Sequence, residues 1–218
     1  MASYVEAGST VIDVGTDHAY LPIRLLQTGV SRRAYASDNK PGPLRRAEAD
    51  ARLGGVSELL TLYLCDGLAL CAPEDVDTVI IAGMGGETMI HILSDAPWAA
   101  EKRLILQPQS KLRELRRWLA SRGLAVLDAS LVDDAGRIYL VWRVGRGTMD
   151  GDAAVDPPLI ERRDVLLRPW LEERIKRGRK QLHGLRSARL ADTDAITALE
   201  TELEALEQIR KETMTWQA

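Results

Sequence analysis

The sequence has few cysteines and no long apolar run. Its two cysteines, Cys65 and Cys71, show neither the pairwise spacing of a zinc site nor the number that a disulfide framework needs. No stretch approaches the roughly 18 apolar residues of a membrane-spanning helix, and the opening MASYVEAGST lacks the basic and apolar regions of a signal peptide. We therefore expect a soluble, cytoplasmic protein with no metal, no membrane partner and two buried thiols.

Charge is unevenly distributed along the chain. The 218 residues are 45% hydrophobic and carry a formal net charge of −3. Residues 162–189 contain ten Lys or Arg and three acids, whereas residues 192–218 contain two bases and seven acids. These segments can neutralise each other as an antiparallel hairpin, or the first can present a basic face to an anionic partner. The charge pattern leaves both interpretations open.

The first 144 residues alternate between strand and helix signals. Runs of β-branched and apolar residues predict strands at 10–14, 33–37, 60–65, 76–83 and 103–108. Apolar residues at helical spacing predict helices at 20–29, 43–55, 89–96 and 110–123. Two further predicted strands, at 124–131 and 138–144, are joined by the turn sequence DDAG.

This order predicts an α/β fold. Apolar strands separated by helices indicate a parallel sheet covered on both faces, and the closing hairpin makes the last pairing antiparallel. Five parallel units followed by a hairpin is the plan of the seven-stranded, doubly wound, Rossmann-like methyltransferase domain. A dinucleotide-dependent dehydrogenase would instead continue with another βαβ half.

The chain changes character after the linker VGRGTMDGDAAVDPP. The residues beyond it have no strand signal, so we predict a methyltransferase domain at 1–156 and a C-terminal helical domain at 157–218. Apolar residues at coiled-coil spacing, with Gly178 at one position of the seam, predict two antiparallel helices. This pattern fits a hairpin that only stiffens the protein or dimerises as well as one that contacts RNA. The seam residues are Leu171, Ile175, Leu182 and Leu185, and Ile196, Leu199, Leu203 and Leu206.

Carboxylates follow three of the first four predicted strands. In an open α/β sheet, ligands bind beyond the carboxyl ends of the strands. A dinucleotide fingerprint needs glycine where this chain has Asp17, whose charge would repel a pyrophosphate. S-adenosylmethionine has no phosphate and carries a sulfonium and an ammonium, so carboxylates attract it. We expect Asp38 to accept the ribose hydroxyl protons and Asp66 to bind the adenine amino group.

Each of these residues also has an ordinary structural interpretation. Aspartates at strand ends commonly bond nearby backbone amides in turns, and a single His18 near a helix start is more often structural than catalytic. The sequence AGMGGETMI is less common, because three glycines in four positions let a flat group approach the backbone. It stands where adenine N-methyltransferases carry an Asx-Pro-Pro-aromatic motif. We therefore expect Met84, Tyr20 and the glycine backbone to hold the target base instead.

Several blocks of this sequence form a pattern: VIDVGTDHAYLP, CDGL, IAGMGG and EKRLILQP, with Asp38 ahead of Gly42-Pro43. This pattern resembles the bacterial tRNA (adenine-N1)-methyltransferases that act on adenine 22. The resemblance extends over nearly the whole chain. It implies a methyltransferase domain, S-adenosylmethionine as methyl donor, tRNA as substrate, and a coiled-coil-like C-terminal domain that helps to grip the tRNA. Two departures stand out. Only MASYVEAGS precedes the first strand where relatives have a basic helix, which would weaken tRNA binding, and many relatives have Glu at Asp38.

Methyl transfer to adenine N1 needs no prior proton removal, because N1 already carries a lone pair. Alignment should therefore dominate, with the nucleotide flipped out and stacked on Tyr20 or Met84. Asp17 is the candidate that stabilises the positive charge developing on the ring. The predicted helix at 110–123 should bury Leu112, Leu115, Trp118 and Leu119 and present a basic face of Lys111, Arg113, Arg116, Arg117 and Arg122 to phosphates.

These arguments give one set of predicted site residues. An NAD-dependent oxidoreductase and a non-catalytic RNA-binding or assembly module stay open as alternatives, and a monomer is the working expectation. The predicted catalytic residues are Asp17 and Tyr20. The predicted cofactor-binding residues are Asp13, Gly15, Asp17, His18, Asp38, Asn39, Asp66, Gly67, Ala82 and Gly83, and the predicted substrate-binding residues are Met84, Gly85, Gly86, Gln107, Pro108, Arg113, Arg116, Arg117, Arg177 and Lys180.

Overall fold

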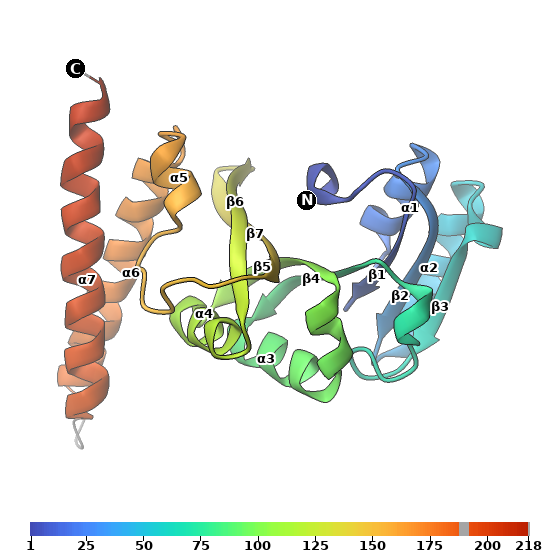
Figure 1. Ribbon diagram of the computed structural model, residues 1–218, viewed down its shortest axis with the longest axis horizontal. Helices are drawn as coiled ribbons and strands as arrows, with labels where there is room; N and C mark the ends of the chain where they lie inside the picture. Colours follow the sequence, from blue (N-terminus) through green and yellow to red (C-terminus); the bar gives the residue numbers. More distant parts are fainter. Residues whose placement is uncertain (188–191, 218) are drawn as a thin grey trace. The chain divides into compact units, whose positions relative to one another are not determined.

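Seven strands form one sheet in the computed structural model, which describes residues 1–187 and 192–217 (Figure 1). The strand order is β3-β2-β1-β4-β5-β7-β6. Strands β1 to β5 pair in parallel, and β7 pairs antiparallel with β5, which confirms the predicted fold. The strands are β1 (Ser9–Val14), β2 (Ser31–Asp38), β3 (Leu60–Leu64), β4 (Thr78–Gly85), β5 (Arg103–Ser110), β6 (Leu124–Asp134) and β7 (Arg137–Arg146).

Helices connect the parallel strands and bury their apolar sides on the sheet. All six residues of β1 are buried, as a central strand covered on both faces requires. One core cluster joins Ile23 of α1 and Ala47 of α2 to Val11, Ile80 and Ile105 of the sheet. The α-helices are α1 (Tyr20–Gln27), α2 (Pro41–Leu53), α3 (Gly86–Asp95), α4 (Leu112–Ser121), α5 (Pro157–Glu161), α6 (Leu167–Arg186) and α7 (Thr193–Met214).

Short 3-10 helices lie between and beside these elements: η1 (Ala2–Tyr4), η2 (Ser57–Leu59), η3 (Pro73–Asp75), η4 (Pro97–Glu101) and η5 (Thr215–Gln217). None of the helices in the described residues is long and apolar enough to cross a membrane.

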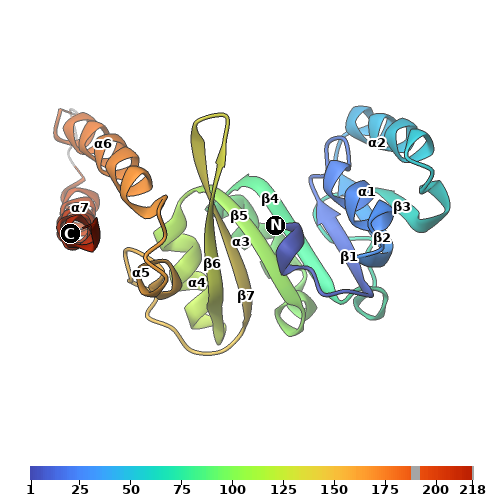
Figure 2. The same ribbon diagram turned by 90° about the horizontal axis from the view of Figure 1, so that it is seen from above.

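The chain divides into two compact units. The first comprises residues 1–129 and 140–152, and the second comprises residues 130–139 and 153–218. The strands β6 and β7 extend into a hairpin whose tip belongs to the second unit (Figure 2). The turn DDAG forms this tip, with Ala135 and Gly136 both at positive φ and the Gly136 amide bonded to Asp133. The functional boundary that we predict at Asp156 stays a prediction.

Helices α6 and α7 pack against each other, as the seam predicted. Leu171, Ile175, Leu203 and Leu206 are buried. A Cβ at Gly178 would lie 2.7 Å from Leu203 Cδ2, so glycine lets the two helices approach closely at this point.

The structure corrects three local expectations. Cys65 is only half-buried, whereas Cys71 is buried, and both are free thiols. Helix α3 begins at Gly86 rather than Met89, because Gly86 allows its first turn to contact the chain at Lys111: a Cβ there would lie 2.4 Å from Lys111 O. Leu112 and Trp118, both expected to be buried, are half-buried.

Candidate active site at the carboxyl edge of the sheet

The loop between β1 and α1 turns sharply three times. Gly15, Asp17 and Ala19 have φ values of 70°, 49° and 54°, in the left-handed region. For the two residues that are not glycine, this conformation costs on the order of 1 kcal/mol each. The amides of Gly15 and Thr16 both donate to Ser37 O of β2, at 2.8 and 3.1 Å. The neighbouring strand thus holds the loop in a conformation that it would not adopt alone.

Asp13 supports this loop from within β1. Its side chain is buried, and Thr16 Oγ1 donates a hydrogen bond to Asp13 Oδ2 at 2.6 Å. Burial raises the pKa of this carboxyl group to about 6, although the Thr16 bond lowers it. Asp13 therefore acts on the loop backbone through Thr16, and its predicted contact with a cofactor stays a prediction.

Helix α2 contacts the same loop from outside the sheet. His18 Nδ1 lies 3.1 Å from Asp50 Oδ2, and Asp17 Oδ1 lies 3.9 Å from Arg46 Nη1. The His18 ring stacks on the Tyr20 ring, with centroids 4.9 Å apart and planes 10° from parallel. Tyr20 itself is 68% exposed. The structure therefore presents an aromatic ring at the start of α1, backed by an imidazole.

The turns that come after β2 and β3 are bonded together. Ser37 Oγ donates to Gly67 O at 2.7 Å, and the Cys65 amide donates to Asp38 O at 3.1 Å. Asp38 Oδ1 accepts the Lys40 amide, while Asn39 and Asp66 are exposed. The carboxylates predicted at these two strand ends thus occur on adjoining turns at one edge of the sheet.

The glycine-rich end of β4 reaches the β1 loop through Met84. A Cβ at Gly15 would lie 2.1 Å from Met84 Cε, so this methyl group rests directly on the Gly15 backbone. Gly83, at a φ of 74°, donates its amide to Gln107 Oε1 at 2.9 Å. Contact between Gly15 and Met84 therefore joins the first and fourth strand ends, with Ala82 and Gly85 half-buried beside Met84 in the sequence.

Gln107 and Pro108 lie below this surface. Gln107 is 7% exposed, and its amide holds Gly83 in place. Pro108 is buried as well. The geometry gives Gln107 a role in shaping the glycine turn, and the predicted contact of both residues with a substrate stays a prediction.

The expectation that Arg116 lies on an exposed basic face is wrong. Its side chain is 4% exposed, with the guanidinium over the Trp142 ring at 5.3 Å and Nη1 3.7 Å from Met149 Sδ. Helical spacing alone placed Arg116 on the polar side, but residues 142 and 149 cover that position. Arg116 is therefore a packing residue.

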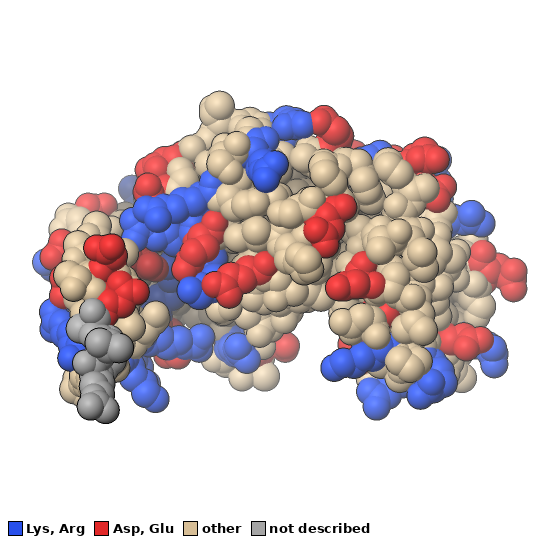
Figure 3. Space-filling view, turned by 90° about the horizontal axis from the view of Figure 1, so that it is seen from below, with Lys and Arg blue, Asp and Glu red and all other residues tan. Residues whose placement is uncertain are grey.

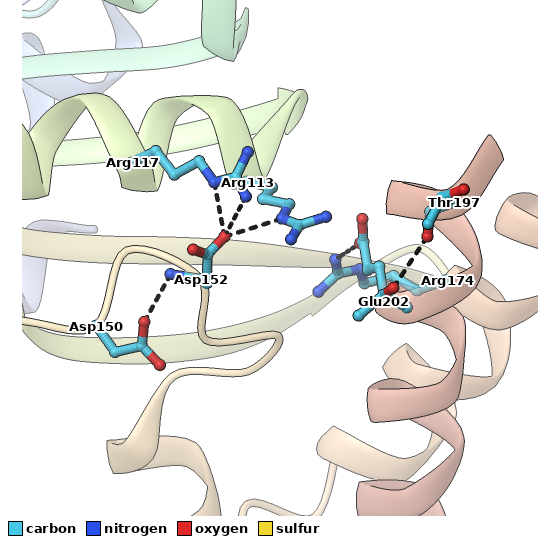
Figure 4. Close-up of polar contacts among 8 residues, drawn as sticks. Arg113, Arg117, Asp150, Asp152, Arg174, Thr197 and Glu202 are labelled. Atoms are coloured by element: carbon cyan, nitrogen blue, oxygen red, sulfur yellow. Dashed lines mark hydrogen bonds and ion pairs between the residues drawn. The ribbon is translucent and has the colours of Figure 1, made fainter. Parts of the chain in front are cut away.

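Arg113 and Arg117 of α4 converge on a single carboxylate (Figure 4). Asp152 Oδ1 accepts hydrogen bonds from Arg113 Nε at 3.2 Å and from Arg117 Nε at 2.6 Å. These bonds, with that from Arg117 the stronger, hold the pKa of Asp152 below its usual value. Two arginines that converge on one oxyanion form the type of arrangement that also binds phosphate.

Several arginines of helix α6 form ion pairs within the second unit. Arg174, Arg179 and Arg186 each pair with a glutamate of α7, the first of them with Glu202 (Figure 4). Arg177 pairs with Glu173 of the same helix, and Lys180 is exposed. On the face shown in Figure 3, basic and acidic side chains accordingly lie next to one another. The hairpin therefore neutralises part of its own charge and leaves some cations at its surface, and contact of these cations with an anionic partner stays a prediction.

Sequence reasoning missed Arg46 and Asp50. They lie four residues apart on α2, and Asp50 is 32 residues from its partner His18, so no short motif links them. The helical spacing does place the two side chains on one face of α2. Nothing in the sequence shows that this face meets the β1 loop. The described residues contain no group of three or more His, Cys, Asp or Glu that could hold a metal ion.

The chain is similar to known methyltransferases in sequence and in fold. A methyltransferase domain family matches residues 1–142. The tRNA (adenine(22)-N(1))-methyltransferase of Bacillus subtilis (strain 168) is 30% identical over 187 residues, which cover 79% of this chain and 78% of the relative.

Solved structures match over almost the full length. A protein of Streptococcus pneumoniae in complex with S-adenosyl-L-methionine is 30% identical, with a TM-score of 0.78 and coverage of 96% of this chain and 95% of that one. The B. subtilis M1A22 tRNA methyltransferase gives a TM-score of 0.80 at 24% identity, over 96% and 95% of the two chains, which is a likeness of fold.

Proposed function

The chain belongs to the tRNA (adenine(22)-N(1))-methyltransferase family, and we propose that it methylates N1 of adenine 22 in tRNA with S-adenosylmethionine as donor. The observation that carries this proposal is the set of carboxylates and left-handed glycine turns at one edge of a methyltransferase-type sheet. Because tRNA is the substrate, we place the enzyme in the cytoplasm. A monomer stays our working expectation.

The residues at the strand ends fit S-adenosylmethionine. Within residues 1–187 and 192–217, Asp66 forms no ion pair, and Asp38 uses only Oδ1 in a hydrogen bond. Both carboxylates can therefore accept hydrogen bonds from a ligand, Asp38 from the ribose and Asp66 from the adenine amino group. Gly83 exposes its backbone at the end of β4, whereas Met84 packs directly on the Gly15 backbone. We assign Asn39 and Gly67 to the same turns.

When bound, S-adenosylmethionine supplies an electrophilic methyl group, and adenine N1 supplies the lone pair that receives it. The chain's task is therefore to hold the base in line and to stabilise the positive charge that the ring acquires. We assign the first role to Tyr20 and to the Met84-Gly85-Gly86 turn. We assign the second to Asp17, whose carboxylate is largely exposed and lies in the β1 loop.

Binding of tRNA needs cations that phosphates can reach. Arg113 and Arg117 form a converging pair on α4, and Lys180 and Arg177 are exposed on α6. We propose that these four side chains contact the tRNA backbone, which makes binding dependent on salt. The buried Arg116 is not part of this set.

The test is methylation of a transcribed tRNA by the purified protein. We expect a methyl group at position 22 that blocks reverse transcription at this nucleotide, and no product from the same tRNA with guanine at position 22. Asp38→Ala should weaken cofactor binding by roughly 10-fold to 100-fold, as expected for loss of a hydrogen bond to a charged acceptor. Equal methylation of both transcripts, or none of either, would contradict the proposal.

A further inference from the structure

Helix α2 contributes a side chain to the β1 loop that no strand-end argument includes. Asp50 Oδ2 lies 3.1 Å from His18 Nδ1, and the two side chains are 32% and 29% exposed. A carboxylate only accepts hydrogen bonds, so the proton of the imidazole must lie on Nδ1 for this bond to form. Asp50 therefore fixes both the tautomer and the orientation of the His18 ring.

The oriented imidazole in turn supports Tyr20. The two rings are stacked nearly parallel, and Ala19 between them is in the left-handed conformation, which brings residues 18 and 20 to the same side of the chain. One face of the Tyr20 ring is covered by the imidazole, while most of the side chain is exposed. An exposed tyrosine without such support would change rotamer freely. A base that stacks on Tyr20 here meets a ring that is already ordered.

We propose that Asp50 is a positioning residue that acts through His18 to hold Tyr20 as the stacking platform for the target adenine. This inference rests on the proposed function. A second contact from the same helix supports it, because Arg46 lies one turn before Asp50 and pairs with Asp17 at 3.9 Å. Helix α2 thus holds the loop on both sides of the Asp17-His18 peptide.

The test compares four single variants and one double variant in tRNA methylation at saturating S-adenosylmethionine. Asp50→Ala should lower kcat/KM for tRNA about fivefold to tenfold, the scale of one lost hydrogen bond, without changing the affinity for S-adenosylmethionine. Asp50→Asn should stay within about twofold of wild type, because its amide oxygen still accepts the Nδ1 proton. Glu48→Gln is the matched control on the same helix, because Glu48 pairs with exposed Arg52, and it should leave activity unchanged. The fourth variant is His18→Ala.

Coupling between Asp50 and His18 decides the mechanism. If Asp50 acts through His18, adding Asp50→Ala to His18→Ala should cause no further loss. Wild-type activity in Asp50→Ala, or a full additional loss in the double variant, would overturn the inference while wild-type methylation still supports the proposed function. Nitrogen NMR of the wild-type protein tests the geometry independently of activity. A proton on His18 Nδ1 is the expected result, and the opposite tautomer would overturn the inference even if no variant folds.

Discussion

Asp13 gives the clearest case of a single side chain whose environment sets its chemistry. The carboxyl group is buried in the central strand, and burial raises its pKa from 3.8 to about 6. The folded protein therefore keeps this proton over a pH range in which the unfolded chain has lost it. In that range, raising the pH lowers the free energy of unfolding. The total loss is about 3 kcal/mol once the pH exceeds the Asp13 pKa of both the unfolded and the folded state.

Asp13→Asn should abolish this dependence, because an amide does not ionise and its oxygen can still accept the Thr16 hydroxyl. Relative to wild type, the variant should gain unfolding free energy as the pH rises from about 4 to about 6.5. The measurement is denaturant unfolding of both proteins across this range. A constant difference between the two proteins would show that the Asp13 pKa is not raised.

The close contact between Gly15 and Met84 gives a second prediction about a single residue. Gly15→Ala would place a Cβ 2.1 Å from Met84 Cε in a backbone conformation that alanine rarely adopts. We expect lower thermal stability and roughly 10-fold or greater loss of S-adenosylmethionine affinity, since both strand ends must move apart. In Gly15→Ala with Met84→Ala, the clash is gone and only the backbone cost persists. If the double variant binds no better in calorimetry, Met84 is not the obstacle.

The sequence predicts which residues lie directly after a strand, while the roles that we assign to them stay predictions. Asp38, Asp66 and the glycines of β4 were predictable because parallel strands bring their carboxyl ends to one edge. Asp50 was not, because its partner is distant in sequence. Arg116 was mispredicted because the covering residues, Trp142 and Met149, come from segments whose position only the tertiary structure determines.

At the scale of elements, the linker that follows β7 places a carboxylate on two arginines of α4. Asp152 occupies the converging pair of Arg113 and Arg117 with one carboxylate oxygen. If these arginines bind tRNA phosphates, Asp152 must be displaced first. Ion pairs at a protein surface each contribute little free energy. Displacing Asp152 from the two arginines should therefore cost a small but measurable amount of free energy.

Asp152→Asn should therefore raise tRNA affinity about twofold to fivefold at moderate salt. Asp150→Asn is the matched control, because it removes the same charge two residues away. Asp150 accepts the Asp152 backbone amide instead of an arginine, and an Asn oxygen can still accept that amide. Fluorescence anisotropy with labelled tRNA measures both. Equal gains in the two variants would mean that general charge, and not release of the arginine pair, explains the effect.

Strands and helices were predictable because their apolar residues have the periods of these elements. The α3 boundary was not, because it depends on the contact between Gly86 and the backbone at Lys111. The pairing of α6 with α7 was predictable from complementary charge blocks, while the individual partners, such as Arg174 with Glu202, were not.

At the scale of the whole molecule, the proposed tasks differ between the two units. The first carries the strand ends that we assign to S-adenosylmethionine, together with Arg113 and Arg117, and the second carries the helical hairpin that we assign to tRNA alone. Residues 130–139 lie in the hairpin of β6 and β7 but belong to the second unit. The proposed tasks of the two units should therefore be tested with the full chain.

Replacing Arg177 and Lys180 together by Ala should weaken tRNA binding and reduce its salt slope by about 1 to 2, since each cation that neutralises a phosphate adds about one to the slope. Affinity for S-adenosylmethionine should not change. The measurement is tRNA affinity over a range of salt concentrations, with cofactor affinity from calorimetry. An unchanged slope would favour a hairpin that only stiffens the protein.

The most direct measurement of the central claim is mass spectrometry of the oligonucleotide that contains position 22, taken from tRNA of cells that lack this protein and cells that regain it. Our account predicts that 1-methyladenosine at position 22 disappears without the protein and returns with the wild-type chain, but returns poorly with Asp38→Ala. Unchanged 1-methyladenosine at this position in cells without the protein and without any other such enzyme would contradict the account.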